Sequence, residues 1–145
     1  MLDQIVEFST SHPILVMSFF AISGIILFTE FRNLSAKYAN IGPALAIGVI
    51  NKEDAVLIDV REMNEIKEGM INNAIHIPLS AINKRLSELD KYKDRAVLVY
   101  CRSGNRSGSV CRTLSSRGFD KVYNLAGGIM AWQDAHLPIS KKRKK

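Results

Sequence analysis

Residues 96–107 read AVLVYCRSGNRS, and this stretch decides how the rest of the chain is interpreted. Its first five residues, 96–100, are apolar and rich in valine, which is typical of a short buried strand. A polar loop at 101–107 follows without a spacer, and a helical pattern begins at its end. In open α/β sheets, ligands bind where the carboxyl ends of strands meet the following helices. The stretch therefore predicts an α/β fold with a ligand-binding loop after one strand.

Cys101 is the first residue of this loop. A thiol there faces the amide groups of a tight loop and the positive end of a helix dipole, which together activate thiols and bind anions. Gly104 allows backbone angles that other residues avoid, so that the N–H groups of the loop converge. Arg102 and Arg106 add permanent positive charges. The pattern indicates an activated thiolate in an anion-binding ring, whose substrate carries an electrophilic atom beside negatively charged oxygens.

Outside the loop, short β-branched runs alternate with amphipathic stretches, which is typical of a parallel sheet flanked by helices. The strands are expected at residues 38–41, 55–59, 74–77, 96–100 and 121–123. The helices are expected at residues 43–51, 62–68, 79–89, 107–117 and 131–135. Beside the N-terminal segment, the chain has room for one compact domain of roughly 100 residues. The predicted fold class is α/β.

The N-terminal segment has a different composition. Residues 8–29 include no Asp, Glu, Lys or Arg, and a helix rising about 1.5 Å per residue over this length crosses a hydrocarbon core of about 30 Å. A buried core helix is a weaker alternative, because a small domain could hardly cover it on all sides. A cleaved signal would begin with basic residues rather than Asp3 and Glu7. We therefore predict a transmembrane helix at residues 13–30.

This span sets the remaining boundaries and the orientation. The expected segments are a short tail at 1–12, the transmembrane helix at 13–30, a link at 31–37, the domain at 38–138 and a basic tail at 139–145. Arg32 and Lys37 follow the span and no basic residue precedes it, and basic residues stay on the cytoplasmic side. We expect the inner membrane of a bacterium, with the N-terminus outside and the domain in the cytoplasm. Two cysteines are too few for a disulfide scaffold, and reduced thiols fit that compartment.

The charge of the chain is concentrated at its C-terminus. The net charge is +6, and residues 141–145 are all Lys or Arg, so the rest of the chain is nearly neutral. A broad nucleic-acid-binding face is therefore not expected. A basic run of this kind is typical of a solvated, disordered tail. On the cytoplasmic side of a membrane, contact with anionic lipid head groups is the alternative.

The loop at residues 101–107 resembles the active-site loop of single-domain rhodaneses. Other landmarks of that family follow in order and spacing, namely DVRE at 59–62, Glu65, GMI at 69–71, AIHIPL at 74–79 and NLAGGIMAW at 124–132. The resemblance covers about residues 38–138. It implies a five-stranded, mainly parallel sheet with helices on both faces, which agrees with the reading of the strands above.

Loop length separates the chemistries that a thiolate loop of this kind can perform. Four residues lie between Cys101 and Arg106, whereas the related dual-specificity phosphatases and arsenate reductases use a loop one residue longer. The shorter loop resembles that of sulfurtransferases. The resemblance implies that Cys101 takes sulfur from a small donor such as thiosulfate, holds it as a persulfide and passes it to a thiol acceptor, either a small molecule or a protein. The expected substrate-binding residues are Arg102, Ser103, Gly104, Asn105, Arg106 and Ser107.

The other polar residues of these motifs are expected to support the loop or to lie at the surface. By the same resemblance, Asp59 and Arg61 support the loop rather than touch the sulfur. Glu62 and Glu65 are interpreted as a solvated helix face, because sulfur transfer from a persulfide needs no acid–base pair. His76 has no second ligand at a plausible spacing, so neither a metal nor another cofactor is expected.

Cys111 and the two adjacent glycines complete the set of candidates. Cys111 lies among apolar residues of the helix after the loop and is predicted to be a small buried residue. A disulfide with Cys101 is disfavoured, because it requires Cα atoms within about 7 Å. Gly127 and Gly128 are expected to form a tight turn at the rim of the active site.

Two classes of function remain open from the sequence. One is a membrane-anchored sulfurtransferase, and the other is a membrane-tethered interaction module with little or no catalysis. Rhodanese domains that have become binding modules commonly lose the cysteine, whereas this loop has Cys101, Gly104 and both arginines. The enzyme is therefore the favoured hypothesis.

Overall fold

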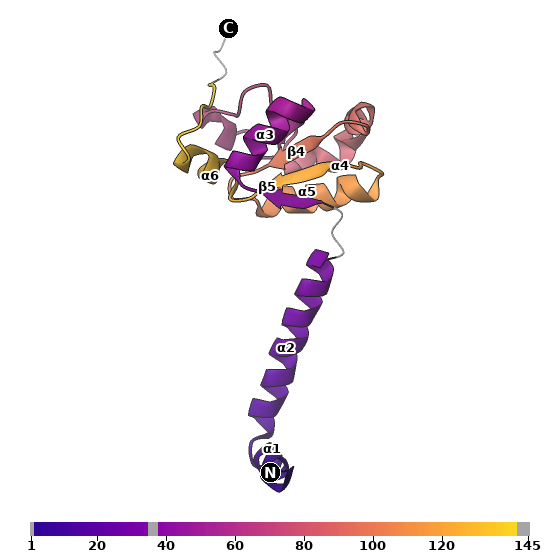
Figure 1. Cartoon of the computed structure of the whole chain (residues 1–145), viewed down its shortest axis with the longest axis vertical. Helices are drawn as coiled ribbons and strands as arrows, with labels where there is room; N and C mark the ends of the chain where they lie inside the picture. Colours follow the sequence, from indigo (N-terminus) through magenta and orange to yellow (C-terminus); the bar gives the residue numbers. More distant parts are fainter. Residues whose placement is uncertain (1, 35–37, 142–145) are drawn as a thin grey trace. The chain divides into compact units, whose positions relative to one another are not determined.

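The computed structural model describes residues 2–34 and 38–141, without the side chains of residues 2, 3, 5, 6 and 29–34. The chain divides into two compact units, Met1–Ala36 and Lys37–Lys145, both drawn in Figure 1. Residues 35–37 of the expected link and 142–145 of the expected basic tail lie outside the described part. The sheet and the loop after it belong to the second unit.

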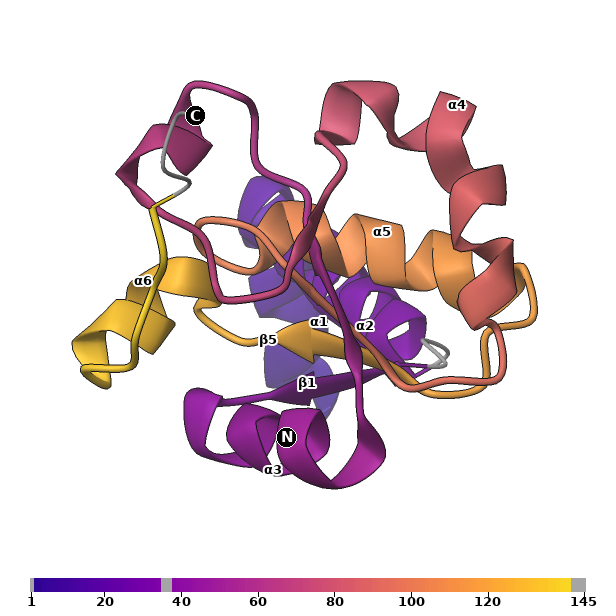
Figure 2. The same cartoon turned by 90° about the horizontal axis from the view of Figure 1, so that it is seen from above.

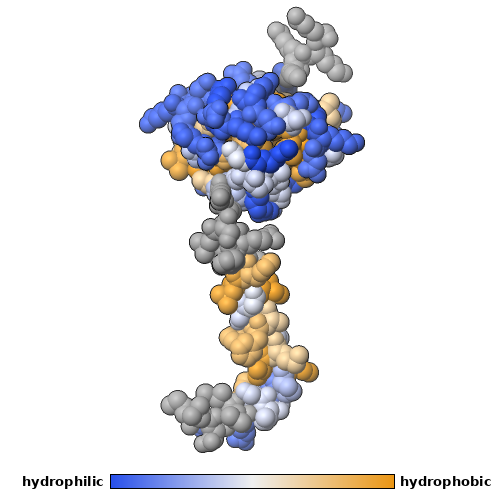
Figure 3. Space-filling view, turned by 90° about the vertical axis from the view of Figure 1, so that its right-hand side faces the viewer, coloured by the Kyte–Doolittle hydropathy of each residue, from blue (hydrophilic) through white to orange (hydrophobic). Residues whose placement is uncertain are grey.

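Two helices make up the first unit, α1 (Leu2–Ser11) and α2 (Pro13–Leu34). Ten large apolar side chains of α2, between Ile14 and Phe28, have more than half of their surface exposed, and the surface of this helix is mostly apolar in Figure 3. Among the described residues, no helix combines the length and the apolar character that crossing a membrane requires. The expected span at 13–30 is therefore helical but is not shown to be transmembrane. The helix also continues to Leu34, within the expected link.

The second unit is built on a five-stranded sheet with the strand order β1-β5-β4-β2-β3, in which all neighbouring strands are parallel. The strands are β1 (Ala39–Ile41), β2 (Val56–Asp59), β3 (Ile75–His76), β4 (Val97–Tyr100) and β5 (Val122–Leu125). Each overlaps a strand expected from the sequence, so the predicted α/β fold with a five-stranded sheet is confirmed. The strand that leads to Cys101, β4, lies at the centre of the sheet.

Helices connect these strands. The α-helices are α3 (Pro43–Glu53), α4 (Ile82–Arg85), α5 (Asn105–Ser116) and α6 (Gly128–Asp134), and the 3-10 helices are η1 (Glu65–Glu68), η2 (Leu79–Ala81) and η3 (Leu86–Tyr92). Two expectations were only partly right: the helix expected at 62–68 is reduced to η1, and the one at 79–89 is divided among η2, α4 and η3. The shortening before η1 has a local cause. The N–H groups of Arg61 and Glu62 bind the carboxylates of Asp59 and Glu65, which favours a turn over a regular helix.

The side chains of β4 alternate between two apolar cores, as expected for a period of two along a strand. Val97 and Val99 join the core formed with α4, η3 and α5, whereas Leu98 and Tyr100 join the core formed with α3 and α6. Figure 2 shows α4 and α5 on one side of the sheet and α3 on the other. Packing on both faces fixes β4 and therefore the point at which the loop begins.

Candidate active site

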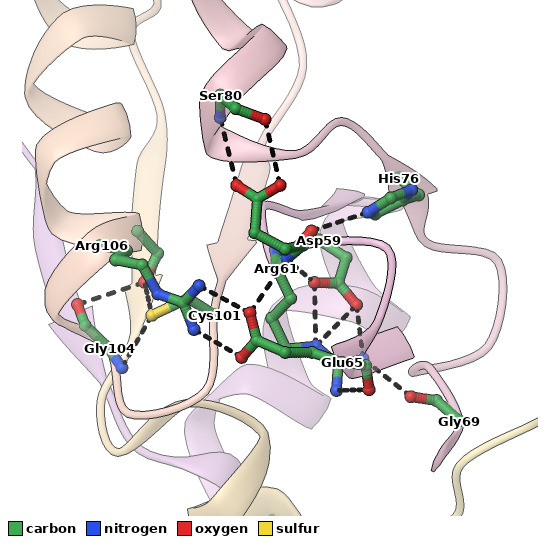
Figure 4. Close-up of polar contacts among 11 residues, drawn as sticks. Asp59, Arg61, Glu65, Gly69, His76, Ser80, Cys101, Gly104 and Arg106 are labelled. Atoms are coloured by element: carbon green, nitrogen blue, oxygen red, sulfur yellow. Dashed lines mark hydrogen bonds and ion pairs between the residues drawn. The ribbon is translucent and has the colours of Figure 1, made fainter. Parts of the chain in front are cut away.

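The loop between β4 and α5 curls around the sulfur of Cys101 (Figure 4). The Gly104 N–H donates a hydrogen bond to Cys101 Sγ at 3.1 Å, and Ser107 Oγ lies 3.4 Å from the same sulfur. Gly104 has a φ of +96°, and a Cβ at this position would lie 3.0 Å from the carbonyl oxygen of Leu125. Glycine avoids both the backbone strain and this close approach. The loop therefore encloses the thiol and supplies it with hydrogen-bond donors.

The N-terminus of α6 binds the outer side of the loop. The Ile129 N–H donates to the carbonyl oxygen of Cys101 at 2.9 Å, and the Met130 N–H donates to that of Arg102 at 3.2 Å. A Cβ on Gly128 would lie only 2.5 Å from both carbonyl groups, so this approach requires glycine. Because the C=O and N–H of a trans peptide point in opposite directions, this attachment turns the next N–H groups away from α6.

The pKa of the Cys101 thiol is lowered from its ordinary value. Burial alone raises this pKa, since a charged sulfur is poorly solvated in the interior. Hydrogen bonds to the thiolate from Ser107, Gly104 and Ser103 outweigh that effect. The thiolate is the nucleophilic form of cysteine, so the loop activates this side chain.

Asn124 on β5 binds the Cys101 loop through hydrogen bonds. It was not among the site residues predicted from the sequence. Its carboxamide oxygen lies 2.6 Å from Ser107 Oγ, and Nδ2 donates to the Gly104 carbonyl at 3.0 Å and to Asn40 Oδ1 at 2.8 Å. The side chain is nearly fully buried. A polar residue within an otherwise apolar buried strand was the signal that could have identified it.

Arg106 forms a two-pronged ion pair with Glu65 (Figure 4). Arg106 Nη1 lies 2.7 Å from Glu65 Oε2, and Nη2 lies 2.6 Å from Oε1. The bond from Arg106 lowers the pKa of Glu65 to about 2; burial opposes the shift and the Glu62 N–H supports it. The expectation that Glu65 belongs to a solvated helix face is wrong, because only 19% of its side chain is exposed. The Glu62 carboxylate binds the N–H and hydroxyl of Ser80.

Asp59 and Arg61 form a buried ion pair, with Arg61 Nη2 2.7 Å from Asp59 Oδ2. Arg61 also donates to the carbonyl oxygens of Gly69 at 2.7 Å and of Glu65 at 3.3 Å. His76 Nε2 lies 2.7 Å from the Arg61 carbonyl oxygen, and the described residues include no cluster of three metal-binding side chains. The buried pair thus fixes the segment that contains Glu65. This segment binds the Cys101 loop through the ion pair between Glu65 and Arg106.

A polar cavity of about 250 Å³ adjoins the loop. The cavity is lined by the segment 61–69 that contains η1, by the loop and by α6, namely Arg61, Asn64, Glu65, Glu68, Gly69, Arg102, Ile129, Met130 and Gln133. The cavity meets the loop at Arg102, whereas the Cys101 thiol is buried and does not line it.

Comparison with known proteins decides the family. The family model described as a rhodanese-like domain matches residues 43–135. The chain belongs to the rhodanese-like family. The five-stranded parallel sheet agrees with the fold that the resemblance implies.

Several members of the rhodanese-like family are similar over much of the chain. The uncharacterized protein YibN of Escherichia coli (strain K12) is 33% identical over 139 residues, which are 95% of this chain and 97% of YibN. A sulfurtransferase of Allochromatium vinosum is 44% identical over 96 residues, 66% of this chain and 88% of that protein. The crystal structure of a rhodanese-related protein from Thermoplasma volcanium has a TM-score of 0.65 and 31% identity, covering 72% of this chain and 100% of that one. These similarities support a transferase role.

The predicted substrate-binding residues of this rhodanese loop fall into two groups. Gly104 and Ser107 are buried against the thiol and Arg106 is held by Glu65, whereas Arg102, Ser103 and Asn105 are exposed. The structure therefore assembles the expected loop, and it adds two residues from outside it, Glu65 and Asn124.

Proposed function

We propose that this rhodanese-family protein is a sulfurtransferase that moves sulfane sulfur from a donor such as thiosulfate to a thiol acceptor, and that Cys101 carries the sulfur as a persulfide. The observation that carries the proposal is the enclosure of the Cys101 thiol by hydrogen-bond donors that lower its pKa. A thiolate is the form of cysteine that attacks sulfur. The sulfurtransferase of Allochromatium vinosum supports the same class of reaction.

The proposed reaction has two displacement steps. The Cys101 thiolate attacks the outer sulfur of thiosulfate, a new S–S bond forms, and the S–S bond of the donor breaks as sulfite leaves with the bonding electrons. The thiolate of the acceptor then attacks the outer sulfur of the persulfide, and Cys101 leaves as a thiolate again. Donors from Ser103, Gly104 and Ser107 stabilise negative charge on the sulfur in both steps.

Turnover of the purified full chain tests this proposal. We expect sulfur transfer from thiosulfate or an organic persulfide to cyanide, and a loss of at least about 1,000-fold in Cys101→Ser, which removes the nucleophile. Cys111→Ser is the matched control, because it replaces the other buried cysteine, and it should keep the activity within about threefold. Full transfer by Cys101→Ser would contradict the proposal. Absence of transfer by the folded wild type with every donor would favour the interaction module instead.

We further propose that residues 13–30 anchor the protein in the inner membrane of a bacterium, with the N-terminus outside and the rhodanese domain in the cytoplasm. The exposed apolar side chains of α2 support this proposal, since a row of this kind is favourable in lipid and unfavourable in water. Cell fractionation and the protease accessibility of tags at each end test it. The full chain should sediment with membranes with only its N-terminal tag cleaved from outside, and a chain in the soluble fraction would contradict it.

We also propose that the basic residues 141–145 contact anionic lipid head groups. Each Lys or Arg near such a surface contributes about 1 kcal/mol, and all five residues are basic. To separate this contact from the anchor, residues 13–30 are left intact and residues 141–145 are replaced by Ser and Gln. In nanodiscs, the replacement should increase protease cleavage of the tail in anionic but not in neutral lipid. Equal cleavage in both lipids would contradict the contact.

A further inference from the structure

The charge of Arg106 is offset before any substrate arrives. Both terminal nitrogens of its guanidinium are bound by Glu65, at 2.6 and 2.7 Å. Glu65 is fixed in turn, because its Oε2 also accepts the Glu62 N–H at 3.0 Å. A planar guanidinium that is bound in this two-pronged way gives up two of its five N–H donors and much of its field.

The charged side chains that line the adjacent cavity, which include Glu65 but not Arg106, leave little excess of positive charge. Arg61 is buried and bound to Asp59 through a second two-pronged pair, from Nε to Oδ1 and from Nη2 to Oδ2. Arg102 is exposed and forms no ion pair within the described residues, while Glu68 contributes an exposed carboxylate to the same lining. The cavity therefore presents a nearly balanced set of charges to an incoming donor.

Sulfur donors differ in the negative charge that they bring to Cys101. Thiosulfate is a dianion, so its encounter with the thiolate gathers three negative charges, which sulfite and the persulfide share after transfer. An organic persulfide brings at most one negative charge. In its protonated form, R–S–SH, the thiolate attacks the terminal sulfur, the S–S bond breaks, and R–S⁻ leaves with the bonding electrons. Like charges a few ångströms apart repel more strongly when partly buried than in water, unless cations offset them.

We infer that Glu65 is a specificity-determining residue which, by neutralising Arg106, favours organic persulfides over thiosulfate as the sulfur donor. The inference rests on the proposed sulfurtransferase function and names the class of donor for the same site. Glu65 acts through Arg106 and does not touch the sulfur. Its removal should therefore change the relative use of the two donors and spare the chemistry of the thiolate.

Glu65→Gln tests this inference in the full chain. The amide can still accept a hydrogen bond from Arg106 but carries no charge. We expect the ratio of kcat/KM for thiosulfate to kcat/KM for cysteine persulfide to rise about tenfold, mostly through a lower KM for thiosulfate. Glu65→Asp, which restores the charge, should return the ratio toward that of the wild type.

Glu88→Gln is the matched control. Glu88 also binds an arginine through two bonds, to Arg85 Nε and Nη2 at 2.8 Å each, but it does not line the cavity. Its replacement should leave the donor ratio within about twofold of the wild type. An unchanged ratio in Glu65→Gln, or equal losses with both donors, would overturn the inference. A wild type that accepts sulfur from neither donor would instead overturn the proposed function.

Discussion

The surroundings of Cys101 and Cys111 differ although both thiols are buried without exposed surface in the same apolar core and both are free. Cys101 lies before the first turn of α5 and receives the Gly104 N–H at 3.1 Å. Cys111 lies inside α5, and its sulfur faces the carbonyl oxygen of Tyr123 at 3.5 Å. The Cys101 sulfur is therefore surrounded by hydrogen-bond donors, whereas the Cys111 sulfur faces a hydrogen-bond acceptor.

The comparison shows that burial alone does not decide whether the pKa of a thiol is raised or lowered. Burial raises the pKa of Cys101, yet the donors of the loop lower it below the ordinary value. Burial also raises the pKa of Cys111, and no comparable donors offset it. The N–H groups around Cys111 are used by the helix itself, whereas those at the start of a helix lack partners within it. Position relative to the helix N-terminus therefore separates the reactive cysteine from the inert one.

The largest effect expected from this comparison is in alkylation. Iodoacetamide at neutral pH should modify Cys101 at least about 100-fold faster than Cys111, because the thiolate reacts and the loop stabilises it. Mass spectrometry of the two cysteine-containing peptides of the full chain measures both rates. Unfolding in denaturant should make the rates similar. Comparable alkylation rates in the folded protein would contradict the difference in reactivity between Cys101 and Cys111.

An effect on stability is expected when the attachment of α6 to the loop is disturbed. Gly128→Ala places a Cβ about 2.5 Å from the carbonyl groups of Cys101 and Arg102, and we expect a loss of about 2–4 kcal/mol in the free energy of unfolding. Gly118→Ala is the control: its φ is +89° but nothing lies within 4 Å of the new Cβ, so the loss should be about 1 kcal/mol. Denaturant unfolding measures both losses, and equal losses would contradict this account of the attachment.

Removing one hydrogen-bond donor from Cys101 should raise its pKa part of the way toward that of Cys111. Ser107→Ala deletes the hydroxyl that lies 3.4 Å from Cys101 Sγ, and we expect the pKa of Cys101 to rise by up to about one unit. The pH dependence of the Cys101 alkylation rate reports this pKa. Ser109→Ala, an exposed serine on the same helix, should leave the profile unchanged. An unshifted profile in Ser107→Ala would assign the activation to the backbone alone.

The last expected effect concerns the pH dependence of the ion pair on the Cys101 side. The pKa of Glu65 is lowered to about 2 in the folded chain, against about 4.3 in an unfolded one. Its contribution to stability is therefore complete above pH about 4.3 and is lost as the pH falls toward about 2. The difference in unfolding free energy between wild type and Glu65→Gln should shrink over that interval. A difference that stays constant down to pH about 2 would contradict the ion pair.

The sequence predicted those parts of the site that are contiguous in the chain. β4, the Cys101 loop and α5 follow one another within residues 97–116, so strand pattern and helix start could be read together. Glu65 and Arg106 are 41 residues apart, and Asn124 lies 17 residues from Ser107 and 84 from Asn40. Contacts of this kind depend on how strands are ordered in the sheet, which local patterns do not encode. The interpretation of Glu65 failed for that reason.

The placement of persulfide sulfur tests the central claim most directly. Full-chain protein is treated with one equivalent of donor, excess donor is removed, and the peptides containing Cys101 and Cys111 are analysed by mass spectrometry under non-reducing conditions. We expect a gain of one sulfur atom on Cys101, its loss on adding an acceptor thiol, and no gain on Cys111. Sulfur on Cys111, or donor consumption without any sulfur on Cys101, would contradict it.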